Sequence, residues 1–428
     1  MNVAVVLFTR DLRVHDNPAL AASVRAAEHV VPLFVHDPAL PAGDNRRRFL
    51  DASLADLAAA LRERGGDLAV LRGDPVREAV RVAKTVGASG IALAADVSAY
   101  ARSREARLAA ACSAERIAFR TFPGVTVVPP GSVRPAGGSH YKVFTPFHRA
   151  WQATTFRDVL AAPRRVSLPG NVMKSWFETD RAATLEAGES AARKRLSSWL
   201  SHLEVYDEMH DNLAADRTSR LSPYLHFGCL SPRELAARVD GRPGAEPFLR
   251  QLCWRDFYHQ VLFAFPQLRR RAYRPGAQDD WRDERDALDA WKSGHTGVPI
   301  VDAGMRQLLA EGWMHNRARL ITASYLTKHL GLDWRLGGDH FFDLLLDGDV
   351  ANNYGNWQWV AGTGNDTKPY RRFNPLRQAE RFDPTGDYVR RYVPELSDIP
   401  GKAVHAPWSL PKPPPTSRYP SPLVLDAR

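Results

Sequence analysis

Residues 3–8 read VAVVLF, and the charged stretch TRDLR follows directly at 9–13. A short apolar run that is rich in valine and bounded by charges is typical of a buried strand. It lacks the basic leader and the cleavage site of a signal peptide, so we interpret it as the first strand of a domain. Similar runs recur along the first part of the chain, with Ala/Leu/Arg helical patterns between them. The expected strands are Val3–Phe8, Val30–Val35, Leu68–Leu71 and Ile91–Ala94, and the expected helices lie near Pro18–Ala27, Arg46–Arg64, Pro75–Val86 and Arg102–Ala114.

This alternation predicts an α/β domain with a doubly wound parallel sheet over residues 1–125. No GxGxxG motif is present, and Gly65-Gly66 stands where a helical pattern ends. A cofactor of this domain would therefore not be held by the dinucleotide-binding fingerprint. Residues 126–195 are rich in Pro, Gly and Ser, which predicts a connector. From 196 to 428 the strand signals vanish, and helical patterns predict an all-α domain with an extended, Pro-rich tail.

Composition narrows the range of partners. The 428-residue chain carries 58 Lys and Arg against 48 Asp and Glu, a net charge of +10, which favours a polyanionic partner such as nucleic acid. Three cysteines cannot complete a four-cysteine iron–sulfur or zinc site, and the 14 His form no HExxH-type motif. We therefore expect no metal and a reducing, cytoplasmic setting. No apolar stretch is long enough to predict a membrane span.

The stretch 352–366 reads NNYGNWQWVAGTGND and concentrates amides, indoles and glycines. It shows neither the stripe of a helix nor the alternation of a strand. None of the 11 Trp lies in the first 150 residues, and most lie beyond residue 195. A core built from large aromatics explains any single Trp. Their concentration in one predicted domain indicates a further role.

Two motifs in the middle of the chain suit a phosphate or a nucleic-acid base. TSRLSP at 218–223 places hydroxyls at the start of a helical pattern, which suits a phosphate but also an ordinary N-cap. LCWRDFYHQ at 252–260 places Arg255 among aromatic residues. That arrangement suits stacking on bases, or a helix that packs its aromatics inward.

Two further motifs bring polar groups together. GWMHNRARLITASYL at 312–326 has a helical period and makes His315 and Arg319 i, i+4 neighbours. LLLDGDVANN at 344–353 carries two carboxylates separated by a glycine. They could be a general acid and base, metal ligands, hydrogen-bonding partners of a ligand, or part of a turn. The ligand-partner interpretation ranks above acid–base catalysis, because no nucleophile or second ligand cluster accompanies them.

Taken in order, the motifs resemble the photolyase/cryptochrome flavoprotein family over nearly the whole chain. FTRDLRVHDNPAL opens the series and YKVFTPFHRAW lies in the connector. TSRLSP, WRDFY, TGVPIVDAGMRQLLAEGWMHNR, DGD and NWQWVAGTG follow. Any one motif is weak, but several in the same order are specific. The class I cyclobutane pyrimidine dimer photolyases are the members that the chain resembles most.

The resemblance implies FAD in the helical domain. Its phosphates would be bound by Tyr206, Thr218, Ser219, Arg220, Leu221 and Ser222. Ribose and flavin would be bound by Arg255, Arg319, Asp347, Gly348 and Asp349, with Arg319 paired to Asp347. Asn353 would face N5 of the flavin, where a neutral amide can form a hydrogen bond at any pH.

The same resemblance implies light-driven repair of UV-damaged DNA, single- or double-stranded. Excited, reduced FAD would pass an electron to a pyrimidine dimer flipped out of the helix, a strategy that photolyases are known to use. Trp357, Trp334 and Trp281 match an electron-transfer chain that reduces FAD in light. Trp254 and Trp359 match residues that flank the dimer. The remaining DNA contacts would be made by Gln251, Asn316, Arg317 and Arg372.

Three positions depart from the class I pattern. Gln251 stands where Glu is usual, His210 where Arg is usual, and Leu320 where Met is usual. Gln is also found in the (6-4) photolyases, which are an alternative. Those enzymes carry a His pair where this chain has His315-Asn316, so pyrimidine dimers come first. A cryptochrome photoreceptor without repair activity is a second alternative. The intact lesion-side Trp pair, and a chain that stops soon after the domain, favour repair.

A second, light-harvesting chromophore is expected in the first domain. Asp96 in DVSAYARSR and Arg46 in NRRRFL resemble the members that bind 8-hydroxy-5-deazaflavin. The folate-binding members carry Asn-Glu where this chain has Tyr100-Ala101, so methenyltetrahydrofolate, or no chromophore, is the alternative. Taken alone, Asp96 and Arg46 are typical surface charges of an α/β domain. We expect a monomer that does not bind membranes.

Overall fold

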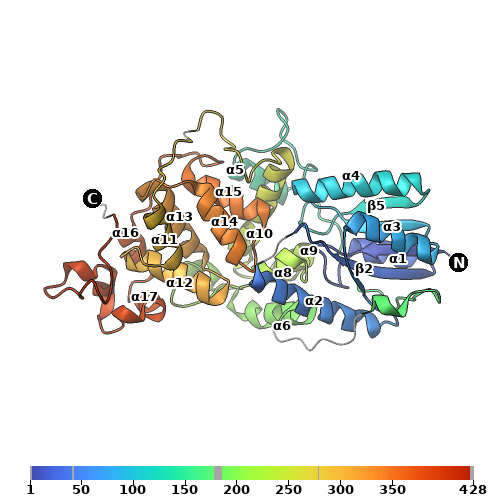
Figure 1. Ribbon diagram of the computed structural model, residues 1–428, viewed down its shortest axis with the longest axis horizontal. Coiled ribbons are helices and arrows are strands. Elements are labelled where there is room, and N and C mark those ends of the chain that lie inside the picture. Colours follow the sequence, from blue (N-terminus) through green and yellow to red (C-terminus); the bar gives the residue numbers. More distant parts are fainter. Residues whose placement is uncertain (1, 41–42, 178–185, 278, 425–428) are drawn as a thin grey trace. The chain divides into compact units, whose positions relative to one another are not determined.

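The computed structural model describes residues 2–40, 43–177, 186–277 and 279–424. Contacts divide the chain into two compact units (Figure 1). The first unit comprises Met1–Leu203 and Ser219–Pro266, and the second comprises Glu204–Thr218 and Gln267–Arg428. The domain boundaries at 125 and 195 were drawn from composition, not from contacts, and stay a prediction.

The first unit contains the predicted doubly wound parallel sheet. Its strand order is β3-β2-β1-β4-β5, and every neighbouring pair is parallel. The strands are β1 Val3–Leu7, β2 His29–His36, β3 Ala69–Arg72, β4 Gly90–Ala94 and β5 Ala118–Phe122. The connecting helices are α1 Pro18–Ala26, α2 Asp44–Arg62, α3 Pro75–Val86 and α4 Ala99–Ala114. The fold class is therefore confirmed, and the four predicted strands and helices are present.

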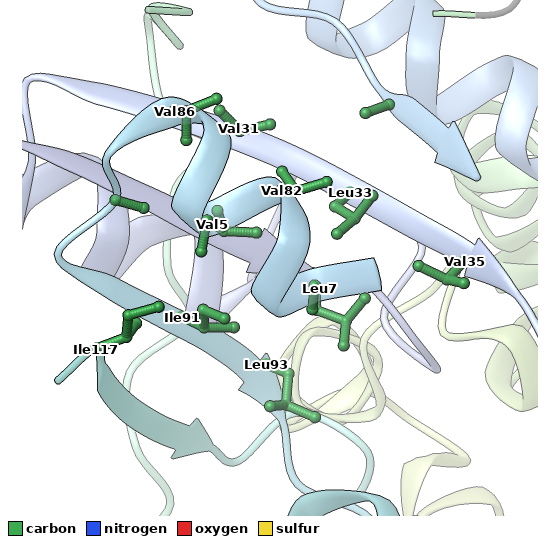
Figure 2. Close-up of a cluster of buried hydrophobic side chains, with 14 of the residues drawn as sticks. Val5, Leu7, Val31, Leu33, Val35, Val82, Val86, Ile91, Leu93 and Ile117 are labelled. Carbon is green, nitrogen blue, oxygen red and sulfur yellow. The ribbon is translucent and has the colours of Figure 1, made fainter. Parts of the chain in front are cut away.

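Side chains at every second position of the central strands form one side of the core. Val5 and Leu7 of β1, with their counterparts on β2 and β4, pack under Val82 and Val86 of α3 (Figure 2). The intervening residue Val6 is also fully buried, at 0% exposure. Both faces of β1 are thus covered, which is why its sequence is a continuous apolar run instead of an alternation.

Sequence analysis missed the edge strand β5. Its segment AFRTF pairs with β4 alone, and all of its residues are partly or fully exposed. An edge strand with one partner does not need the apolar run that marks a central strand.

The first unit also contains helices within and beyond the predicted connector. They are α5 Phe144–Gln152, η1 Lys174–Trp176, α6 Gly188–Trp199, η2 Leu200–His202, α8 Ser222–Phe227, α9 Pro232–Val239 and α10 Ala245–Ala264. The connector was expected to have little structure, and α5 corrects that expectation. Phe144, Phe147, His148 and Trp151 of α5 are buried at helical spacing, but Pro146 at the third position obscures the pattern.

The second unit is helical, as predicted. Its elements are α7 Tyr206–Met209, α11 Arg285–Ser293, α12 Pro299–Glu311, α13 Asn316–Ser324, η3 Tyr325–His329, α14 Trp334–Leu344, α15 Val350–Ala361, α16 Pro375–Phe382 and α17 Asp387–Tyr392, followed by the short turns η4 Pro394–Leu396, η5 Gly401–His405 and η6 Pro407–Ser409. Over the described part of the chain, no helix is both long and apolar enough to cross a membrane.

The stretch 352–366 lies largely in α15, in agreement with the all-α domain predicted for 196–428. Helix α15 is covered by protein on several sides and therefore shows no single apolar stripe. One prediction about local structure in this unit was wrong. Residues 312–315 are not helical: Gly312, at φ 61°, terminates α12, and His315 precedes the first residue of α13 as its N-cap. A positive φ favours glycine and ends a helix.

Candidate functional site

Helix α15 and its N-cap carry four of the candidate residues, Asp349, Asn353, Trp357 and Trp359. Asp349 is its N-cap, and one carboxylate oxygen accepts hydrogen bonds from the backbone N–H and the side-chain amide of Asn352, both at 2.8 Å. Asn353 and Trp357 follow at i, i+4 spacing and share one face of the helix. The side-chain amide of Asn353 donates to the carbonyl of Gly338 at 2.8 Å. That bond fixes the Asn353 side chain through its nitrogen, and the side-chain oxygen takes no part in it.

Glycines of α14 allow α15 to approach closely. An added Cβ at Gly337 would lie 2.2 Å from Cη2 of Trp357, and one at Gly338 would lie 3.0 Å from Cε1 of Tyr354. Trp357 itself is 3% exposed. The indole of Trp357 is therefore locked against the backbone of α14 and cannot change rotamer without moving that helix.

The predicted pair of Arg319 and Asp347 is confirmed. Two nitrogen–oxygen hydrogen bonds join them, at 3.0 and 2.8 Å, and Nε of Arg319 also donates to the carbonyl of Met314 at 2.8 Å. The Asp347 side chain is 5% exposed. A buried carboxylate is tolerated here because a bidentate guanidinium compensates it.

The TSRLSP stretch offers hydroxyls for a phosphate. Leu221 is the N-cap of α8 and Ser222 its first residue, while Arg220 adopts a left-handed φ of 50°. The Thr218 hydroxyl is buried and meets no hydrogen-bond partner among the described residues. A buried hydroxyl without a partner costs free energy unless a ligand satisfies it. This part of the donor set therefore fits a nucleotide phosphate.

Tyr206 of the second unit is buried, and its burial raises the pKa of its hydroxyl. Its ring stacks on His210, with centroids 4.9 Å apart. Gly348 follows the carboxylate of Asp347 in a turn and donates its N–H to the carbonyl of Leu345 at 3.3 Å.

The other two tryptophans of the predicted chain are connected by an ion pair. The indole N–H of Trp281 donates to Asp279 at 2.8 Å. Asp279 receives two hydrogen bonds from Arg335, at 2.9 and 2.7 Å. The guanidinium carbon of Arg335 lies 4.7 Å from the ring centre of Trp334. Trp281 and Trp334, which were expected only from the family resemblance, are thus connected through Asp279 and Arg335. Neither Asp279 nor Arg335 was a candidate in the sequence.

In the first unit, α10 presents an aromatic stack. Trp254 lies flat on Phe144 of α5, with ring centres 3.7 Å apart and an angle of 3° between the planes. Gln251, one turn earlier, is exposed. Arg255 donates to the carbonyls of Val125 and Leu225, so part of its guanidinium is occupied within the unit. Phe144 was missed, although it stands in the YKVFTPFHRAW motif.

In the second unit, the segment after α15 gathers aromatic and basic side chains. Arg371 lies 4.9 Å from the ring centre of Trp359, and Tyr370 is 95% exposed. Arg372 is exposed, and one of its nitrogens donates to the carbonyl of Lys328. Tyr370 was also missed, and its position between Pro369 and two arginines was the available signal.

The two DNA candidates on α13 differ in their environment. Asn316 is exposed at the first turn. Arg317 is held by Asp211 through two hydrogen bonds of 2.6 Å, and Arg317 holds the pKa of that carboxyl below its ordinary value against the effect of burial. A phosphate at Arg317 would share the guanidinium with Asp211.

The antenna candidates lie at the carboxyl ends of the sheet strands. Asp96 follows β4 and pairs with Arg10, which follows β1, at 3.4 Å. Arg46 is buried on α2, at 5% exposure. Arg104 of α4 is also buried, and its Nε and one terminal nitrogen find no hydrogen-bond acceptor among the described residues. Strands β1 and β4 are parallel neighbours, and the connections that follow them lead to opposite halves of the sheet. Open α/β sheets bind ligands at such a switch point.

Comparisons with known proteins agree over almost the whole chain. Residues 4–165 match the family described as DNA photolyase, and residues 248–427 match the FAD binding domain of DNA photolyase. The deoxyribodipyrimidine photo-lyase of Streptomyces griseus is 51% identical over 425 residues, covering 96% of this chain and 93% of the relative.

Solved structures give the same result. A bacterial class III photolyase from Agrobacterium tumefaciens has a TM-score of 0.93 at 33% identity, covering 99% of this chain and 94% of that one. An archaeal photolyase from Sulfolobus tokodaii, solved with two FAD molecules, has a TM-score of 0.87 at 30% identity. It covers 99% of this chain and 96% of that one.

Proposed function

The chain belongs to the DNA photolyase family, and we propose that it is a carbon–carbon lyase that uses light to split cyclobutane pyrimidine dimers in DNA. The observation that carries the proposal is the 51% identity, over nearly the full length, to a deoxyribodipyrimidine photo-lyase. The net charge of +10 supports a DNA substrate, because phosphates attract a basic protein at long range.

We assign FAD to the residues predicted from the motifs. When bound and reduced, FAD supplies an electron to the substrate on absorbing light. Asp347 and Asp349 would accept hydrogen bonds from the ligand's hydroxyl and N–H groups, and two hydrogen bonds from Arg319 fix the Asp347 carboxylate for that task. Asn353 donates through its amide nitrogen to Gly338, which leaves its side-chain oxygen as an acceptor directed by a fixed rotamer.

The phosphate end of FAD is assigned to the TSRLSP stretch. The unpartnered Thr218 hydroxyl supports this assignment, and Ser219 and Ser222 add hydroxyls to the same stretch. The guanidinium of Arg255 donates to two backbone carbonyls, which fix its position and leave its positive charge available to an anionic ligand. Tyr206 completes the set as a neutral hydroxyl, and burial raises its pKa further above neutral pH.

We assign contact with the flipped dimer to Trp254 and Trp359. Phe144 stacks on Trp254 and fixes the plane of its indole, on which a base would stack. Gln251 and Asn316 are exposed amides that can bond to base edges, and Arg372 can contact a phosphate. The neutral amide of Gln251 reads a base edge without the charge that a Glu would bring.

We assign the second chromophore to the carboxyl edge of the sheet, and 8-hydroxy-5-deazaflavin remains the first choice. Arg46 and Asp96 would contact it, and two nitrogens of Arg104 that form no hydrogen bond within the described residues add donors for an anionic ring or chain, beside a weak ion pair with Glu105 at 3.9 Å. The two FAD molecules of the Sulfolobus tokodaii protein make a flavin-like ring a reasonable occupant. An absorption band of the purified protein outside the flavin bands tests this; flavin bands alone contradict it.

We infer that the protein acts in the cytoplasm as a monomer. Its three cysteines, Cys112, Cys229 and Cys253, are free and buried, which suits a reducing compartment. Light scattering after gel filtration tests the oligomeric state, and a mass twice that of the chain contradicts the monomer.

The central experiment measures dimer repair directly. Irradiated oligothymidine is mixed with protein whose flavin has been chemically reduced, and dimers are counted after blue light and in the dark. Loss of dimers only in light supports the proposal, whereas no loss contradicts it. A parallel substrate that carries a (6-4) photoproduct decides between the two lesions.

A pair of variants tests the proposed contact between Trp359 and the pyrimidine dimer. Trp359→Ala should lose affinity for dimers while keeping the flavin spectrum. Trp408→Ala removes another partly buried indole of the second unit and is the matched control. Equal affinity in both variants contradicts the role of Trp359.

A further inference from the structure

Two residues outside the predicted site connect the two outer members of the tryptophan chain. Asp279 accepts the indole N–H of Trp281 at 2.8 Å, and Arg335 holds Asp279 through two hydrogen bonds of 2.9 and 2.7 Å. The same Arg335 lies over the ring of Trp334, 4.7 Å from its centre. The positive end of this ion pair therefore faces Trp334, and the negative end faces Trp281.

The two indoles have opposite surroundings. Trp334 is fully buried, and among the described residues its N–H finds no acceptor. Trp281 is partly exposed, and its N–H bonds to a carboxylate. Removal of an electron makes an indole positive and its N–H more acidic. A guanidinium over the ring opposes that change, and a carboxylate on the N–H favours it.

We propose that the ion pair of Arg335 and Asp279 directs electron movement along the chain by making Trp281 easier to oxidise than Trp334. This inference rests on the proposed function, in which Trp357, Trp334 and Trp281 conduct an electron toward photoexcited FAD. In the step concerned, one electron passes from Trp281 to oxidised Trp334. Trp334 becomes neutral, Trp281 becomes the cation radical, and no covalent bond is made or broken. Arg335 and Asp279 are positioning residues, since neither is oxidised.

A second carboxylate, that of Asp333, also contacts Arg335, but it does not accept the N–H of Trp334, so the two indole N–H groups still differ. Asp333 caps α14 and also binds Arg335, with two contacts of 3.1 Å. These contacts help to hold the guanidinium over the Trp334 ring at the start of α14. Hydrogen bonds from Arg335, followed by that from Trp281, hold the pKa of Asp279 below its ordinary value, so this residue stays a carboxylate at neutral pH. The Asp279 side chain is 44% exposed, so water screens part of its charge, but its hydrogen bond to Trp281 is direct.

The test is flash photolysis of the full-length, FAD-loaded protein with oxidised flavin. The readout is the yield of long-lived tryptophan radical, measured by transient absorption. Asp279→Asn keeps the shape and removes the charge. Trp281→Phe removes the proposed terminal donor. Asp398→Asn is the matched control, because Asp398 is also held by two hydrogen bonds from an arginine, Arg418, at the surface of the second unit.

Asp279→Asn should reduce the yield several-fold, toward that of Trp281→Phe, while Asp398→Asn should equal the wild type. An unchanged yield in Asp279→Asn, with a yield lost in Trp281→Phe, overturns this inference alone. A yield that survives Trp281→Phe shows that the chain ends elsewhere and overturns the assumed chain as well.

A second measurement separates the electrostatic effect of Asp279 from its effect on the position of Trp281. Electron paramagnetic resonance of the trapped radical reports its exchangeable N–H proton. In the wild type, the coupling should be that of a hydrogen-bonded indole, and Asp279→Glu, which keeps a carboxylate, should preserve it. If Asp279→Asn lowers the yield but the wild-type radical shows no such bond, the inference is overturned.

Discussion

Asn353 and Trp357 lie one turn apart on α15, yet they are assigned different tasks. The amide of Asn353 is fixed by Gly338, and the indole of Trp357 is fixed by close contact with Gly337. An amide is difficult to oxidise and an indole is comparatively easy. We therefore assign redox chemistry on this face of the helix to Trp357, and the orientation of a ligand to Asn353.

Replacement of Trp357 by Phe should separate reduction of the flavin from repair. Light-driven reduction should fall to near the baseline, because phenyl does not relay an electron. Repair by chemically reduced protein should stay near the wild-type rate, with a stability loss of about 1–2 kcal/mol from the smaller buried ring. Time courses of flavin bleaching and of dimer loss check both statements.

Trp291→Phe is the matched control for that variant. Trp291 is fully buried, and its ring centre lies 6.0 Å from that of Trp357, but it is not a member of the proposed chain. It should keep photoreduction. A repair defect in chemically reduced Trp357→Phe contradicts the division of tasks.

Arg317 and Arg372 should contribute unequally to DNA affinity. Arg372 is exposed, and one of its nitrogens donates to a backbone carbonyl. In Arg317, two nitrogens donate to the carboxylate of Asp211. Arg372→Gln should reduce the slope of log affinity against log salt by about 0.9, the value for one phosphate contact. Arg317→Gln should reduce it less. Titration of labelled duplex at several salt concentrations measures both slopes, and equal slopes contradict the unequal roles.

The resemblance to the family predicted the pairing of Arg319 with Asp347, which the structure confirms. It did not predict that Asp211 lies beside Arg317, or that Asp279 lies beside Trp281 and Arg335. Those contacts join segments far apart in the chain, and charged residues of this kind occur on every protein surface.

Helix α15 could not be recognised from the periodicity of its sequence. Its buried residues Tyr354, Trp357, Gln358 and Val360 point in several directions, so no single stripe marks it. Its boundaries follow ordinary rules nonetheless: Asp349 caps the start, and Gly362, at φ 80°, ends it. Capping residues were therefore the better signal here, and periodicity the weaker one.

Loss of the α15 cap should affect both stability and FAD. Asp349→Ala removes the acceptor for the N–H of Asn352, which costs about 1 kcal/mol. Asp74→Ala removes an equivalent cap from α3 in the first unit, where Asp74 accepts from Val76 and Arg77, and is the matched control. Both should lower the denaturation midpoint by a similar amount. Only Asp349→Ala should also weaken retention of FAD during gel filtration; equal retention in both variants contradicts a role beyond capping.

Within the first unit, the part least accessible to prediction is the packing of residues 219–266 with the N-terminal segment. Arg13 is fully buried and donates to the carbonyls of Asp16, Gly124 and Gly228. An added Cβ at Gly228 would lie 1.9 Å from the carbonyl oxygen of Arg10. Fold class followed from local alternation of strands and helices, but such long-range contacts depend on single residues more than 200 positions apart.

Stability of the whole molecule should depend on buried histidines. Burial lowers the pKa of His315 and of His340 to about 4 each. Below about pH 6.5 the unfolded chain binds a proton at each of these residues, while the folded chain does so only near pH 4. In that window their contribution to the free energy of unfolding falls as the pH falls. Burial raises the pKa of Asp256 to about 6, which acts in the opposite direction between pH 6 and 3.8.

His340→Leu isolates one of these contributions. The His340 ring packs near Trp291, and Lys292 is the cation that faces it, so leucine fills an apolar position without leaving a charge unpaired. Between pH 6.5 and 4 the variant should lose stability less steeply than the wild type, by about one proton, or about 1.4 kcal/mol per pH unit. Urea denaturation at several pH values measures the difference. His295→Leu, at an exposed histidine, is the control and should follow the wild type. Parallel curves for wild type and His340→Leu would mean that His340 takes up its proton equally in the folded and unfolded chains.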